Sequence, residues 1–213
     1  MKNIVILISG RGSNMKALLS AELGCNIKAV ISNKSDASGL AFARAQGIPT
    51  AILAHRDYPD RESFDAALSR LIDGYEPDFV ILAGFMRILT ADFVMHYAGR
   101  LINIHPSLLP AYTGLHTHAR ALADGVKIHG CTVHFVTPDL DHGPIIIQAA
   151  VAVLQNDTEA LLAERVLQEE HRIYAQAIRG LCAGTITLGD EGKVINHNLP
   201  LPGQALISPS LPA

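Results

Sequence analysis

An apolar run that ends in a glycine-rich turn constrains the fold of this chain most. Residues 3–8 are apolar after Asn3 and rich in β-branched side chains, which is typical of a strand covered on both faces. The run leads into Gly10-Arg11-Gly12-Ser13-Asn14 and then into a helical pattern with apolar residues at 15, 18 and 19. Unpaired amides and the helix dipole meet at such a turn, so it predicts an anion site. A tight turn without a ligand is the alternative.

The turn fits a phosphate monoester better than a dinucleotide. Met15 occupies the place of the third glycine in the dinucleotide fingerprint. The second predicted strand ends in Ser32-Asn33, where an acid that binds a ribose would be expected. A nicotinamide dinucleotide is therefore disfavoured.

Strand and helix patterns alternate along most of the chain. Further strands are predicted at 27–31, 50–53, 79–83, 101–105, 130–136 and 145–153, and further helices at 38–46, 61–73, 91–97, 118–124 and 158–179. This order predicts a single-domain, doubly wound α/β fold with a mostly parallel sheet and helices on both faces. The strand at 130–136 alternates as if half covered. A hairpin is expected at 185–196, which places the domain at 1–197 and an irregular, proline-rich tail at 198–213.

Composition restricts the class of protein. The 213 residues are 49% hydrophobic and 17% charged, as in a well-buried globular protein. A net charge of −3 argues against a nucleic-acid surface, and no apolar run reaches the roughly 18 residues of a membrane span. We therefore expect a cytoplasmic protein with no nucleic-acid or membrane partner, and composition leaves open whether it is a monomer or a homodimer.

No metal is expected either. The three cysteines are scattered without a C-x-x-C spacing, which disfavours a disulfide framework or a thiolate site. The pairs His116 with His118 and His129 with His134 lack a third ligand at a familiar spacing.

Two polar residues interrupt the apolar strand at 101–105. Asn103 and His105 are two residues apart, so their side chains leave the same face, just before Pro106 ends the strand. An amide and an imidazolium can stabilise an oxyanion, and Asp141 on a turn-rich loop could hold the imidazole in a chosen tautomer and charge state. No serine or cysteine nucleophile has a familiar spacing. These residues predict acyl-type transfer between two bound substrates, with a satisfied buried pair as the alternative.

Three other features could belong to the same cleft, because ligands collect beyond the carboxyl ends of parallel strands. The loop at 84–89 mixes apolar side chains with Arg87, which suits an amphipathic ring system, with simple packing of its apolar side chains into the core as the alternative. Glu170 lies in the apolar stripe of the last long helix, where a carboxylate usually has a function or a partner. Arg61 is a cation at a helix N-terminus, which indicates either an anionic ligand or a chance surface placement.

The motif Asn103-x-His105-Pro106-Ser107-Leu108-Leu109-Pro110, followed by Asp141-x-Gly143, resembles the 10-formyltetrahydrofolate-dependent formyltransferase family. The resemblance covers nearly all of the chain up to the predicted hairpin. It implies a Rossmann-like enzyme that transfers the formyl group of the co-substrate 10-formyltetrahydrofolate to the amine of glycinamide ribonucleotide in purine biosynthesis. It also implies that Asn103, His105 and Asp141 are the catalytic residues.

The resemblance assigns binding residues as well. It implies that the ribonucleotide is bound by Gly12, Ser13, Asn14 and Glu170, and that the folate is bound by Arg61, Met86, Arg87, Ile88, Leu89, Asn103, Thr137, Leu140 and Asp141. Two positions depart from the family pattern. His142 stands where glycine is expected, which questions the dihedrals of its loop, and Leu167 stands where relatives often carry a polar residue facing the nucleotide.

Three other functions were weighed. A formyltetrahydrofolate hydrolase or a methionyl-tRNA formyltransferase would be expected to carry an added domain, and the tRNA enzyme a basic surface. A binding module that used the glycine turn alone would leave Asn103, His105 and Asp141 without a role.

Overall fold

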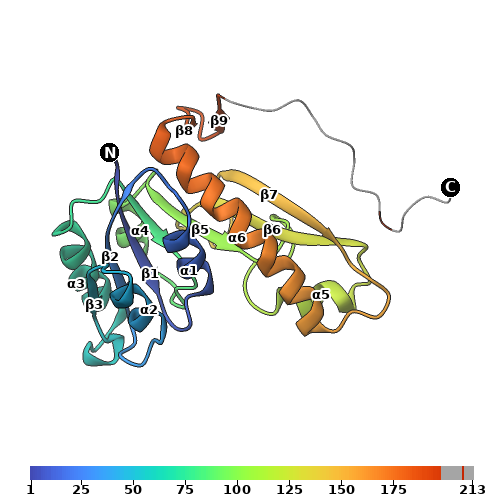
Figure 1. Cartoon of the computed structure of the whole chain (residues 1–213), viewed down its shortest axis with the longest axis horizontal. Coiled ribbons are helices and arrows are strands. Elements are labelled where there is room, and N and C mark those ends of the chain that lie inside the picture. Colours follow the sequence, from blue (N-terminus) through green and yellow to red (C-terminus); the bar gives the residue numbers. More distant parts are fainter. Residues whose placement is uncertain (198–207, 209–213) are drawn as a thin grey trace.

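The computed structural model describes residues 1–197 and 208, and its described part is built on a seven-stranded sheet (Figure 1). The strands are β1 (Asn3–Ile8), β2 (Asn26–Ser32), β3 (Thr50–Ile52), β4 (Phe79–Leu82), β5 (Leu101–His105), β6 (Ile128–Phe135) and β7 (Ile145–Ala152). Their order is β3-β2-β1-β4-β5-β6-β7. The pairs from β3 to β5 are parallel, whereas β6 is antiparallel to both β5 and β7. The predicted, mostly parallel α/β sheet is confirmed.

Six α-helices and a short 3₁₀ helix connect these strands in the described chain. They are α1 (Ser13–Ser20), α2 (Gly39–Ala45), η1 (His55–Asp57), α3 (Arg61–Asp73), α4 (Ala91–His96), α5 (Thr117–Ala123) and α6 (Glu159–Ala183). The small hairpin of β8 (Ile186–Leu188) and β9 (Val194–Asn196) lies where it was predicted. The predicted tail, 198–213, lies outside the described residues except for Ser208. Within the described part, each helix is too short or too polar to cross a membrane.

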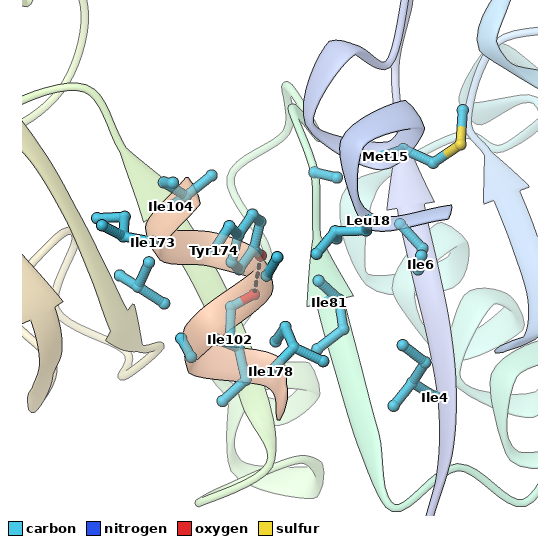
Figure 2. Close-up of a cluster of buried hydrophobic side chains, with 14 of the residues drawn as sticks. Ile4, Ile6, Met15, Leu18, Ile81, Ile102, Ile104, Ile173, Tyr174 and Ile178 are labelled. Atoms are coloured by element: carbon cyan, nitrogen blue, oxygen red, sulfur yellow. Dashed lines mark hydrogen bonds between the residues drawn. The ribbon is translucent and has the colours of Figure 1, made fainter. Parts of the chain in front are cut away.

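The apolar run of β1 is buried because helices cover both faces of the sheet. Ile4, Ile6 and Ile8 pack in one cluster with α1, α2 and α6, whereas Val5 and Leu7 pack in another with α3 and α4. Figure 2 shows the first cluster, in which side chains of α1 and α6 meet those of β1, β4 and β5. The buried hydroxyl of Tyr174 donates to the carbonyl oxygens of Leu82 at 2.9 Å and Ile102 at 3.3 Å.

Two sequence predictions need correction. Helix α6 extends to Ala183, beyond the expected end at 179, and the Thr158 hydroxyl caps it by accepting from the Leu161 amide at 3.3 Å. The half-covered interpretation of 130–136 is wrong, because β6 is buried from His129 to Phe135. Its Cys131 and Val133 pack in the cluster that contains α6, and on its other side the Leu109 amide donates to Thr132 Oγ1 at 3.0 Å.

Candidate active site

The candidate site lies where β4 and β5 end side by side. Leu82 of β4 pairs with Asn103 of β5, so the loop 84–89 leaves the sheet next to the last residues of β5. The amide of Met86 donates to Ser9 Oγ at 2.8 Å, and the Ser9 amide donates to the Gly84 carbonyl at 3.1 Å. This loop is therefore anchored to the end of β1, immediately before the glycine-rich turn.

Two neighbouring cavities meet at this edge. The apolar cavity has a volume of about 480 Å³, and the residues that line it are Leu82, Phe85, Met86, Arg87, Ile88, Leu89, Val94, Asn103, His105, Gly114, Leu115, His134, Val136, Thr137, Pro138, Leu140 and Asp141. The second cavity, of about 290 Å³, is lined by Gly84, Phe85, Met86, Asn103, Ile104, His105, Pro106, Gly114, Leu115, His116, Thr117, His118 and Glu159. Both cavities are lined by Asn103 and His105, the polar residues among those they share, so ligands in the two cavities would meet at these residues.

His105 is buried, with both ring nitrogens close to acceptor oxygens. Nε2 lies 2.9 Å from the carbonyl oxygen of Tyr112, and because a carbonyl can only accept, Nε2 carries a proton. Nδ1 lies 3.5 Å from Oδ2 of Asp141. A second proton on Nδ1 would point at this carboxylate, so the site can hold an imidazolium between two acceptors.

Asp141 joins three segments of the chain. Besides facing His105, its Oδ2 accepts from the Gly114 amide at 2.8 Å, and its Oδ1 lies 3.9 Å from His134 Nε2. Asp141 has a φ of +57°, a left-handed conformation that Asp tolerates better than most residues. The left-handed residue of this loop is thus Asp141 and not His142, whose exposed ring donates from Nδ1 to the Leu140 carbonyl at 2.6 Å.

The loop at 84–89 presents apolar side chains to the apolar cavity. The side chains of Met86 and Ile88 are 70% and 63% exposed, which leaves them free to cover a ligand. The guanidinium of Arg87 lies over the Phe64 ring at 4.7 Å, a cation–π contact that ties the loop to α3. All the residues predicted to contact the folate line this cavity except Arg61, which is exposed at the start of α3.

The predicted ribonucleotide residues form their own cluster at the start of α1 and line neither cavity. Gly12 has a φ of +65°, and a Cβ atom there would lie 2.9 Å from Met15 Cε. Glu170 of α6 is buried, and its Oε2 accepts from Asn14 Nδ2 at 2.7 Å. Burial raises the pKa of Glu170, whereas the bond from Asn14 opposes that rise. This agrees with the prediction that a carboxylate on the apolar stripe has a partner.

Several lining residues were not singled out from the sequence as site residues. Gly114 and Leu115 come from a loop whose path no local pattern specifies. Phe85 lies in the apolar loop at 84–89, where the sequence does not distinguish it from its neighbours. His134 interrupts an apolar strand as Asn103 and His105 do, but its sequence spacing relates it only to His129. The structure pairs His129 with His118 instead, Nε2 to Nδ1 at 3.2 Å, and burial lowers the pKa of His129 to about 4. Among the described residues, no three His, Cys, Asp or Glu side chains are grouped to hold a metal ion.

Known proteins resemble this chain in sequence and in fold. The formyl transferase family matches residues 2–178, and the chain belongs to that family. It is 48% identical over 208 residues to the phosphoribosylglycinamide formyltransferase of Escherichia coli (strain K12), covering 95% of this chain and 98% of that protein.

Two solved structures are also similar. Glycinamide ribonucleotide transformylase 1 from Symbiobacterium toebii superposes with a TM-score of 0.89 at 44% identity, covering 93% of this chain and 95% of that one. A formyltetrahydrofolate deformylase from Pseudomonas syringae superposes with a TM-score of 0.85 at 31% identity, covering 92% of this chain and 66% of that one.

Proposed function

We propose that this enzyme transfers the formyl group of 10-formyltetrahydrofolate to the amine of phosphoribosylglycinamide, in de novo purine biosynthesis. The products are formylglycinamide ribonucleotide and tetrahydrofolate. The observation that carries the proposal is that two cavities of different character share Asn103 and His105. The names of the relatives support the choice of substrates. The enzyme acts on small molecules as a monomer or homodimer.

The apolar cavity suits the folate. A fused ring with polar edges and apolar faces needs apolar walls and a few convergent polar groups. The cavity provides Met86, Ile88 and Leu140 as apolar walls, and Asn103 and Asp141 as polar groups. The formyl group then lies near the residues that the second cavity shares.

The amine of phosphoribosylglycinamide attacks the formyl carbon. A carbon–nitrogen bond forms and the formyl oxygen becomes an oxyanion, which the amide of Asn103 and the imidazolium of His105 stabilise. The bond from the formyl carbon to N10 of the folate then breaks. The amine loses one proton and N10 gains one, so proton transfer through His105 balances the reaction.

Asp141 orients His105 and faces the nitrogen that takes the second proton when the imidazolium forms. With Nε2 donating to the Tyr112 carbonyl, the only position for a second proton is Nδ1, which faces Asp141. The Gly114 amide holds the carboxylate in place at 2.8 Å. The Asp141 carboxylate thereby favours the form of His105 that can stabilise an oxyanion and donate a proton.

The phosphate of the ribonucleotide binds at the turn of Gly12, Ser13 and Asn14, where open amides begin helix α1. Glu170 binds the glycinamide end of the same substrate, and Asn14 holds its carboxylate. Leu167 offers no polar group to the ribose or phosphate, so these contacts depend on the turn.

One assay separates this proposal from its rivals. The purified protein is mixed with 10-formyltetrahydrofolate, and the release of tetrahydrofolate is followed with and without phosphoribosylglycinamide. We expect release only when the amine is present. Release without the amine would identify a hydrolase, and no release in either case would identify a binding module; either result would refute the proposal.

A further inference from the structure

We propose that His134 is a positioning residue that orients the side-chain amide of Asn103, by accepting a hydrogen bond from Asn103 Nδ2 on its own unprotonated Nε2. This inference deepens the proposed function, because it depends on Asn103 as a donor to the oxyanion. It starts from a fully buried imidazole on β6, 1% exposed, to which the proposed mechanism gives no role.

The backbone decides which nitrogen of His134 carries the proton. Nδ1 lies 2.8 Å from the carbonyl oxygen of Phe135, which can only accept, so Nδ1 is the protonated nitrogen. Burial lowers the pKa of His134, and this effect outweighs the opposing influence of Phe135 and Asp141. The ring is therefore neutral, and its Nε2 presents a lone pair.

That lone pair faces Asn103. The two residues are directly opposite in the antiparallel pairing of β5 and β6, and Asn103 Nδ2 lies 3.3 Å from His134 Nε2. A lone pair attracts the NH₂ end of an amide and repels its oxygen. If Nε2 carried the proton instead, the amide would turn over and offer Oδ1 to His134. The tautomer of His134 thus selects which end of the Asn103 side-chain amide, the NH₂ group or the oxygen, faces His134.

The selection matters because Asn103 lines both cavities. One Nδ2–H is used by His134, and the second remains for an oxygen that gains charge during the reaction. The charged groups that face His134 are Asp141, whose Oδ1 lies 3.9 Å from Nε2, and His105. The two buried imidazoles have opposite tautomers, since the Tyr112 carbonyl places a proton on Nε2 of His105.

Two substitutions distinguish the effect of a hydrogen-bond acceptor at the position of Nε2 from the effect of the rest of the His134 ring. The terminal amide of His134→Gln reaches the position of Nε2 and can still accept from Asn103. The shorter His134→Asn reaches only the position of Nδ1. We expect His134→Asn to lower kcat about tenfold or more, because a misoriented Asn103 loses part of the stabilisation that one oxyanion donor provides. We expect the kcat of His134→Gln to lie within about threefold of wild type. The KM of both substrates stays near its wild-type value in each variant.

A structural role alone would affect both variants alike. Equal loss of kcat in the two variants, unchanged kcat in His134→Asn, or a change confined to KM would each overturn the proposal. Thermal unfolding of both variants verifies that they are folded, and kcat is compared at a temperature where both are native.

Nuclear magnetic resonance tests the tautomer without using activity. In protein labelled with ¹⁵N at histidine, with His134→Gln as the reference for assignment, we expect a pyrrole-type Nδ1 and a pyridine-type Nε2 for His134. A protonated Nε2 would overturn the inference. If the wild-type protein transfers no formyl group, the proposed function fails, but this spectrum still decides the state of His134.

Discussion

Replacing Gly12 by alanine tests the phosphate turn most directly. Gly12 precedes α1 in a left-handed conformation, φ +65° and ψ +44°, which costs an L-residue about 1–2 kcal/mol. The added Cβ would also lie 2.9 Å from Met15 Cε, but this is the end of a flexible side chain that can move. For a chain of this size, the full strain would lower the Tm by about 2–8 °C, and the fall should be smaller because the turn of the free variant can relax.

The same strain predicts a binding defect. In the free variant the turn can relax out of the left-handed region, and substrate binding must restore it. Restoring the turn costs about the same 1–2 kcal/mol, which corresponds to a roughly 5- to 30-fold increase in the KM of the ribonucleotide. The KM of the folate and the value of kcat should change little, because neither cavity includes Gly12.

Gly47 is the matched control. It has a φ of +73° and open space where a Cβ would lie, and it follows α2 away from the turn. Gly47→Ala should therefore lose stability by a similar amount and keep the KM of the ribonucleotide. Steady-state kinetics with either substrate varied, together with thermal unfolding, measure both effects. An unchanged KM in Gly12→Ala, or an equal increase in Gly47→Ala, would refute this reasoning.

Four other substitutions have expected outcomes. His105→Ala and Asp141→Ala should each lower kcat by about 10²-fold or more; near wild-type turnover of either variant would exclude the proposed catalytic roles. Glu170→Gln should gain stability relative to wild type as pH rises above the unfolded pKa of glutamate, because burial raises the folded pKa and stabilises only the protonated form. Urea denaturation at pH 4 and pH 8 measures this, and a pH-independent difference would contradict it. Tyr174→Phe should lower the free energy of unfolding by about 0.5–1.5 kcal/mol, because it removes the hydrogen bonds from a buried hydroxyl to the carbonyl oxygens of Leu82 and Ile102; an unchanged denaturation midpoint would argue against these bonds.

The sequence by itself determined the α/β order, the glycine turn and the three proposed catalytic residues. Strand and helix periodicities are local, so the run at β1 and the stripe of α6 could be recognised without tertiary information. Asn103 and His105 were recognisable because they interrupt an apolar strand, and Asp141 because it lies on a turn-rich loop at the spacing of the motif. Glu170 was recognisable for a similar reason, and the structure supplies its partner, Asn14.

Tertiary structure decided everything that depends on partners distant in the chain. The burial of β6 results from α6 and the segment around Leu109. The alternation of residues within β6 cannot indicate that either of them covers the strand. The tautomers of His105 and His134 are set by backbone carbonyls of Tyr112 and Phe135, whose directions follow from the folded path of the chain. The two cavities likewise meet at Asn103 and His105 only because the fold brings β4, β5 and three loops together. Local patterns specify which residues are buried or polar, but only the fold brings their hydrogen-bonding atoms within reach of each other.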